Sequence, residues 1–172
     1  MVGRATVKLA FDRLHTSLLR LLSTLCVLVA IGCADPSAVL PSADVLHSAL
    51  SAAVKRGPGA IVSLDSVIGG DWRTLYVFGP YTPSTTIDRC VGMRVNHRDI
   101  DARDGINLLV LKPAKGRASS VVVARDVDFG PEAVGRAYSR GAASFAVRLP
   151  SPQAWGHLVP ASGAMPGMTR CN

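Results

Sequence analysis

The segment that decides the fold is residues 71–83, which read DWRTLYVFGPYTP. A strand is predicted over residues 73–78, because Leu75 and Tyr76 begin an alternation that places successive side chains on opposite faces. Gly-Pro ends this strand, since proline has no amide hydrogen for a sheet ladder. Thr-Pro then provides an N-cap and a first-turn proline for a short helix over residues 82–91, closed by glycine.

Elements on either side complete the pattern. A helix is predicted to begin at Ser42, because apolar side chains recur on one face and Lys-Arg-Gly ends it at residues 55–57. A Gly-Gly-Asp turn is expected to join the strand over 60–67 to the next one as antiparallel neighbours. One or two helical turns are expected over residues 131–139. Further strands, rich in β-branched and aliphatic residues, are predicted over residues 60–67, 106–111, 119–124 and 144–149.

This order of elements predicts an α+β fold. We expect a small, mainly antiparallel β-sheet of four to five strands, with an N-terminal helix and a short helix after the second strand. The helices are expected to cover one face of the sheet. A parallel, doubly wound sheet is not favoured, because the chain has too few crossover helices.

The start of the chain has the features of an export signal. Residues 1–20 contain four basic residues and one aspartate, and a mainly apolar run follows over residues 21–31. This length fits a signal peptide, whereas a membrane-spanning helix needs about 20 apolar residues. An uncleaved anchor helix with an incidental cysteine is the other interpretation.

The run ends in Ala30-Ile31-Gly32-Cys33, which resembles the lipobox of bacterial lipoproteins. The resemblance implies cleavage before Cys33 and lipidation of that cysteine. The protein would then be exported and anchored by lipid to a membrane of the cell envelope, which makes that membrane its first partner. Ala34 favours the outer membrane where the host has one, because an aspartate there retains enteric lipoproteins in the inner membrane.

These features divide the chain into four parts. The sequence predicts a lipoprotein signal peptide over residues 1–32, a tether over 33–41, the α+β domain over 42–149 and a flexible C-terminal tail over 150–172. The tether contains two prolines and small residues. The tail is rich in Pro, Ser, Gly and Ala.

Two cysteines, Cys90 and Cys171, remain after removal of the signal and lipidation of Cys33. An exported compartment permits a disulfide between them. Cys90 lies at helical spacing from Ile87, however, and Cys171 lies in the predicted tail. We therefore expect a buried, unpaired Cys90, with the disulfide as the alternative.

Charge and motifs restrict the function. The chain carries a net charge of +7, and its arginines are scattered without a concentrated basic stripe, so no nucleic-acid partner is predicted. Asp99, Asp101 and Asp104 do not match a calcium loop, which requires a turn glycine and a bidentate glutamate at positions that other residues occupy here. The sequence has no Gly-x-Ser-x-Gly elbow. No catalytic residue, metal or cofactor is predicted.

Residues 71–83 and the later DGINLLV at 104–110 together resemble a signature of short bacterial lipoproteins of uncharacterised function. In that group a Trp-led strand runs into Gly-Pro-Tyr-Thr and a helix. The resemblance covers residues 60–147 and implies the fold and the lipoprotein character. It implies no activity and no site residue.

We therefore expect a non-catalytic interaction module of the cell envelope. Trp72, Arg73, Tyr76 and Tyr81 are the expected contact surface for an envelope protein or a glycan. The other interpretation is that the rings pack the sheet against a helix. The alternative function is a small envelope hydrolase without a motif, for which a pocket gathering Asp, His and Ser would be the structural sign. A mainly structural protein is a third possibility.

Overall fold

The computed structural model describes residues 42–149, 156–161 and 168–171. The predicted signal peptide over residues 1–32, the proposed lipidation site Cys33 and the predicted tether over 33–41 lie outside the described residues. Within the described ranges, no helix combines the length and the apolar character that crossing a bilayer requires.

The described chain consists of short strands with a few helices between them. Its α-helices are α2 (Ala43–Arg56), α3 (Leu64–Val67) and α4 (Ser84–Val91). Two 3-10 helices are η1 (Ile100–Ala102) and η2 (Arg140–Ala142). The strands are β1 (Ile61–Ser63), β2 (Thr74–Phe78), β3 (Ile106–Lys112), β4 (Ser119–Ala124), β5 (Asp128–Phe129), β6 (Arg136–Ser139), β7 (Ser144–Arg148), β8 (His157–Pro160) and β9 (Met168–Arg170).

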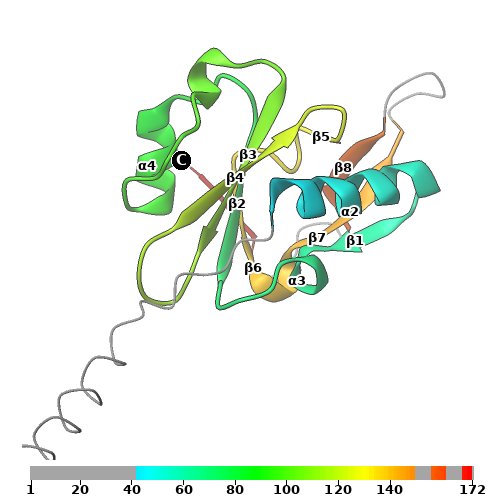
Figure 1. Cartoon of the computed structure of the whole chain (residues 1–172), viewed down its shortest axis with the longest axis horizontal. Coiled ribbons are helices and arrows are strands. Elements are labelled where there is room, and N and C mark those ends of the chain that lie inside the picture. Colours follow the sequence, from blue (N-terminus) through cyan, green and yellow to red (C-terminus); the bar gives the residue numbers. More distant parts are fainter. Residues whose placement is uncertain (1–41, 150–155, 162–167, 172) are drawn as a thin grey trace, which may run out of the picture. The chain divides into compact units, whose positions relative to one another are not determined.

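These strands form two sheets (Figure 1). One has the order β1-β7-β8-β5 and the other the order β4-β3-β2-β6-β9. Every strand pair is antiparallel except β5 with β8. The predicted α+β class with mainly antiparallel pairing is confirmed, although the strands form two sheets where a single sheet of four to five strands was expected.

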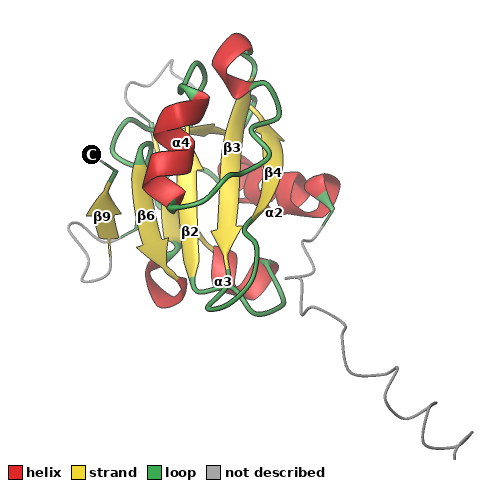
Figure 2. Ribbon diagram, turned by 90° about the vertical axis from the view of Figure 1, so that its left-hand side faces the viewer, coloured by secondary structure: helices red, strands yellow, loops and turns green. Residues whose placement is uncertain are grey.

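Strand β2 lies at the centre of the five-stranded sheet and separates two hydrophobic cores. Leu75 and Val77 pack into the core that also contains α2 and the four-stranded sheet. Tyr76 and Phe78 point the other way, into a core covered by α4. Figure 2 shows α4 lying across this face of the sheet. Helices α2 and α4 therefore cover opposite faces of this sheet, and the expectation that the helices cover one face was wrong.

The N-terminal helix and the short helix after β2 are confirmed, but α4 begins only at Ser84, and Thr82 does not cap it because its Oγ1 donates to the Gly79 carbonyl oxygen. Helix α2 begins after Ser42, whose side chain accepts a hydrogen bond from the Val45 amide at 3.3 Å. Its apolar stripe buries Leu46 and Leu50. Helix α4 ends at Gly92, whose φ of 75° is the left-handed conformation that favours glycine at this position.

The segment over residues 60–67 is a strand only in its first half. Strand β1 ends at Ser63, and Leu64 begins the short helix α3. Leu64 and Ile68, which are four residues apart, are both fully buried, as one turn of helix allows. The Gly-Gly-Asp turn does not join a hairpin, because β1 pairs with β7 whereas β2 pairs with β3 and β6.

The second half of the chain contains more strand than expected. Residues 136–139, expected to be helical, form β6 and pair with β2. The predicted tail over 150–172 contains β8, where Leu158 and Val159 are buried, and β9 at the edge of the larger sheet. The local composition of these segments is typical of turns and tails, and their strand partners lie elsewhere in the chain.

Candidate functional site

The expected aromatic contact surface is not formed. Trp72 is completely buried, and its Nε1 donates a hydrogen bond to the Ile68 carbonyl oxygen at 3.0 Å. The Arg140 guanidinium lies 5.2 Å from the Trp72 ring centroid and covers the ring. Tyr76 is 7% exposed beneath α4, and burial raises the pKa of its hydroxyl. The packing interpretation is therefore correct for both residues.

Tyr81 and Arg73 are exposed, but the structure does not bring them together. Tyr81 is 59% exposed, has a φ of 59° and donates its amide to the Ile100 carbonyl oxygen at 2.8 Å. Arg73 precedes β2, whereas Tyr81 follows it. Because a five-residue strand is about 17 Å long, the two residues lie at opposite ends of β2.

Charged side chains instead gather in a pocket of about 530 Å³, which we call the aspartate pocket. Strands β5 and β8 form one wall, where Asp128 lies opposite His157 in the parallel register. The turn after β4 and the segment before β3 form the rest. The pocket is lined by Asp104, Gly105, Arg125, Asp126, Asp128, Gly156 and His157.

Arg125 joins two of the pocket's aspartates. Its Nη1 lies 3.0 Å from Asp104 Oδ1, and its Nη2 lies 3.0 Å from Asp128 Oδ2. The hydrogen bond that Arg125 donates to Asp128 and the negative charge of that carboxylate raise the pKa of Arg125. Both ends of this guanidinium fork are therefore occupied by carboxylates.

The third aspartate is paired with a helix residue. His47 Nε2 on α2 lies 2.9 Å from Asp126 Oδ1 and 3.0 Å from Oδ2. This hydrogen bond lowers the pKa of Asp126. The two residues are 79 positions apart in sequence, so no local pattern indicates their pairing.

Two buried polar atoms at the pocket have no hydrogen-bond partner within the described residues. His157 Nδ1 lies 3.8 Å from Asp128 Oδ2, beyond hydrogen-bonding distance. Asn107 is fully buried and its Nδ2 donates to Asp128 Oδ1 at 3.3 Å, but its Oδ1 has no partner. Unpaired buried polar atoms are uncommon, and each calls for a physical reason such as strain, a catalytic role or a bound water or ion.

The sequence analysis did not find this pocket. A local signal exists, because the run Arg-Asp-Val-Asp over residues 125–128 follows a strand directly, where charged side chains gather at a sheet end. His157 was assigned to the tail, so its contribution was not visible. Among the described residues, no group of histidine, cysteine, aspartate and glutamate side chains is arranged to hold a metal ion.

A second histidine–aspartate pair connects α4 to the loop that follows it. His97 Nε2 lies 2.8 Å from Asp88 Oδ1, and the Val95 amide donates to the same oxygen at 2.9 Å. The hydrogen bond from His97 lowers the pKa of Asp88. None of these residues lines the aspartate pocket, so the pair serves to hold the loop.

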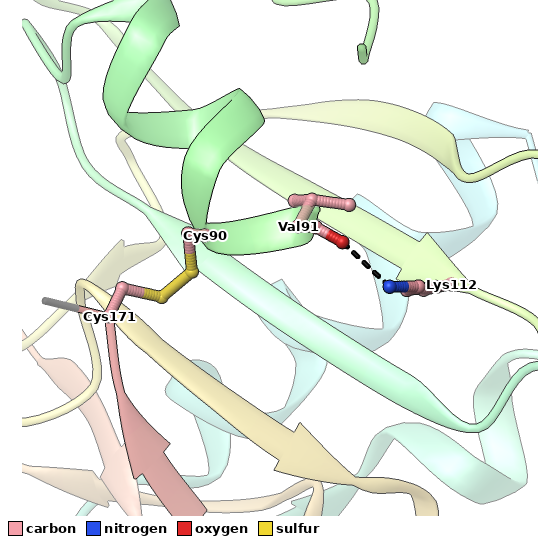
Figure 3. The surroundings of a disulfide bond; sticks show 4 residues. All are labelled: Cys90, Val91, Lys112 and Cys171. Carbon is pink, nitrogen blue, oxygen red and sulfur yellow. Dashed lines mark hydrogen bonds between the residues drawn. A yellow bond between two sulfur atoms is a disulfide. The ribbon is translucent and has the colours of Figure 1, made fainter. Parts of the chain in front are cut away.

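Cys90 and Cys171 form a disulfide (Figure 3). Their Cα atoms lie 5.3 Å apart, within the usual range, although 81 residues separate them in sequence. The expectation of an unpaired Cys90 is therefore corrected. The bridge ties the end of β9 to α4 and removes Cys171 from a free tail.

The fold and the pocket define a small α+β domain with a hollow lined by aspartates and an edge strand tied by a disulfide. Comparison of the chain with protein-family models, with curated proteins and with solved structures found no match. The resemblance to a group of short bacterial lipoproteins therefore stays a prediction from the residues quoted for it.

Proposed function

We propose that the protein is a lipid-anchored bacterial envelope protein whose domain is a non-catalytic interaction module. The proposed location rests on the sequence Ala30-Ile31-Gly32-Cys33 at the end of an apolar run. Lipid on Cys33 would hold the mature chain to a membrane. Because several acyl chains make such an anchor effectively permanent, the domain would act close to the membrane. A disulfide such as Cys90–Cys171 is compatible with an oxidising envelope compartment.

The aspartate pocket is the proposed contact site of this module. Its three aspartates are all engaged with cationic or imidazole groups, Arg125 with two of them and His47 with the third. The hydrogen bond to His47 lowers the pKa of Asp126 and so weakens it as a general base, while each carboxylate keeps lone pairs that can accept from a ligand, so this pairing favours binding over catalysis. The pairing of the aspartates is the observation that carries the non-catalytic half of the proposal.

The lining favours a ligand rich in hydroxyl groups, such as an envelope glycan. Carboxylates accept hydrogen bonds from hydroxyls through the lone pairs that their present partners leave free. At about 530 Å³ the hollow has the size of a small-ligand site. Asp104 and Asp126 have side-chain exposures of 69% and 57%, so ligand groups can reach them without displacing the core.

The anchor is tested by intact mass and membrane fractionation of the wild-type chain and Cys33→Ala in a host that processes lipoproteins. We expect the wild-type mass to show removal of residues 1–32 and addition of acyl chains, and the mass of Cys33→Ala to show neither change. A full-length, unmodified wild-type chain would refute the anchor.

The contact site is tested by titrating the full chain with a soluble peptidoglycan glycan fragment and following backbone amide resonances. We expect shifts at residues 104–105, 125–128 and 156–157. Asp104→Asn together with Asp126→Asn should weaken binding about tenfold, since charged hydrogen bonds contribute about 1.5–3 kcal/mol each before solvent screening at exposed positions. Tyr81→Ala is the matched control. Weaker glycan binding by Tyr81→Ala but not by the double aspartate variant would place the contact surface outside the pocket.

A second candidate is a small envelope hydrolase, which the buried, unpartnered Nδ1 of His157 beside Asp128 favours. Histidine next to a carboxylate is a common general base. No serine or cysteine lines the pocket, so the nucleophile would be water. Release of a new reducing end or amine from the same glycan fragment, abolished by His157→Gln, would select this candidate.

A further inference from the structure

We propose that the Cys90–Cys171 disulfide is an exchangeable one, and that its reduction by a dithiol releases strand β9 from the edge of the larger sheet. Both cysteines are half-buried and line an open hollow of about 460 Å³. A thiolate has to approach a sulfur atom directly to attack it, so this access is the first requirement for exchange. The proposal does not rest on the lipid anchor or on the aspartate pocket.

Two arginines make the surroundings of the bridge electropositive. Arg89 and Arg170 precede the two cysteines in sequence, and both line the same hollow. Neither is among the ion pairs formed by the described residues. Guanidinium groups attract an attacking thiolate and stabilise the thiolate that leaves, and both effects speed exchange.

Strand β9 is held by few other interactions. It is three residues long and lies at the sheet edge, where it pairs only with β6 (Figure 2). The Cys171 amide adds one hydrogen bond, to the Gly135 carbonyl oxygen at 2.9 Å. Because so short a ladder is marginal on its own, cleavage of the bridge would detach β9 and expose the outer edge of β6.

The chemistry balances with an external dithiol as the reductant. Its first thiolate attacks one protein sulfur, forms a mixed disulfide and releases the other protein sulfur as a thiolate. Its second thiol then attacks the mixed disulfide and frees the remaining sulfur. The dithiol is oxidised to a disulfide, and its two electrons and two protons end on Cys90 and Cys171.

The rate of reduction of the oxidised full chain by dithiothreitol in native buffer tests the proposal, with thiols trapped by a maleimide and counted by intact mass. We expect reduction to be faster than global unfolding measured on the same sample. Arg89→Gln with Arg170→Gln should slow it about three- to tenfold, because each charge acts over a few ångströms in a solvent-exposed hollow. The difference in reduction rate between the wild-type chain and the double arginine variant should decrease at about 1 M salt, where exposed charges are screened.

Arg117→Gln, in the loop after β3 at an exposed position that does not line the hollow, is the matched control and should leave the rate within about twofold. The release of β9 has its own measurement. In Cys90→Ser/Cys171→Ser, hydrogen exchange should accelerate at residues 168–171 and stay slow in β2 and β3. Reduction no faster than unfolding, an unchanged rate in the double arginine variant, or loss of protection throughout the sheet would each overturn the proposal.

Discussion

Asp128 on β5 and His157 on β8 lie opposite each other in the parallel strand pair, with 3.8 Å between Asp128 Oδ2 and His157 Nδ1. The carboxylate is already engaged. Its Oδ1 accepts from the Phe129 amide at 2.9 Å and from Asn107, and its Oδ2 accepts from Arg125. Asp128 therefore connects β3, β5 and the turn after β4, and its contribution to stability should exceed that of the other pocket aspartates.

Asp128→Asn tests this role. We expect the free energy of unfolding to fall by about 1–3 kcal/mol, because a charged acceptor with several buried donors is weakened. Asp104→Asn, whose side chain is 69% exposed, should change it by less than about 0.5 kcal/mol. Urea unfolding of both variants decides the matter, and equal effects would contradict the central role of Asp128.

Trp72 should be a core residue in solution. Trp72→Ala removes a fully buried ring and its hydrogen bond to Ile68, and should cost about 3–5 kcal/mol in unfolding free energy. Tyr81→Ala, at a 59% exposed side chain, should stay within about 0.5 kcal/mol of wild type. Denaturant unfolding of the two variants provides the comparison. A Trp72→Ala variant as stable as wild type would contradict the burial of Trp72.

We expect the contribution of the Asp88–His97 pair to the stability of the fold to be lost in acid. The hydrogen bond from His97 holds the folded-state pKa of Asp88 below its ordinary value of 3.8. The stabilisation by the Asp88–His97 hydrogen bond is therefore fully present at pH values above 3.8, where Asp88 is charged in the unfolded chain as well. It is lost as the pH falls from there through the folded-state pKa of Asp88. Melting temperatures measured from pH 7 to pH 2 should fall less steeply for Asp88→Asn than for wild type. Parallel curves would show that the pair contributes nothing.

Lys112 should stabilise the end of α4. Its Nζ donates to the carbonyl oxygen of Val91, the last residue of the helix, at 2.7 Å (Figure 3). A cation bonded to a terminal carbonyl satisfies an orphan acceptor and opposes the helix dipole. Lys112→Met keeps the aliphatic stem and should cost about 0.5–1.5 kcal/mol. Lys115→Met, exposed in the hairpin loop, should be neutral, and thermal melts of the two variants test the difference.

Predictions from sequence were accurate where the deciding interactions are local. The N-cap at Ser42 and the stop at Gly92 act within a few residues, and helices α2 and α4 were located by them. The strands predicted over 106–111 and 119–124 from their own β-branched and aliphatic residues correspond to β3 and β4. Strand β6 was missed because its apolar environment is supplied by β2, from which it is distant in sequence.

At the candidate site, too, local patterns were informative and contacts between distant segments were not foreseen. Aromatic residues beside turns suggested a contact surface, yet Trp72 and Tyr76 are buried because β2 has a hydrophobic core on each face. A single-strand alternation cannot reveal that both faces are covered. The aspartate pocket combines His157 from β8 with the 125–128 run, and His47 from α2 pairs with Asp126 of its lining; only the folded chain places these residues together.

The sequence by itself located helices α2 and α4, strand β2 with the turn after it, and the α+β class, and it predicts an export signal over residues 1–32. Caps, periodicity and turn residues act through the backbone nearby, so they can be read in order along the chain. Only the tertiary structure decided the division into two sheets, the strands β8 and β9 and the pairing of Cys90 with Cys171 across 81 residues. These depend on which distant segments bury one another, and burial is a property of the folded chain as a whole.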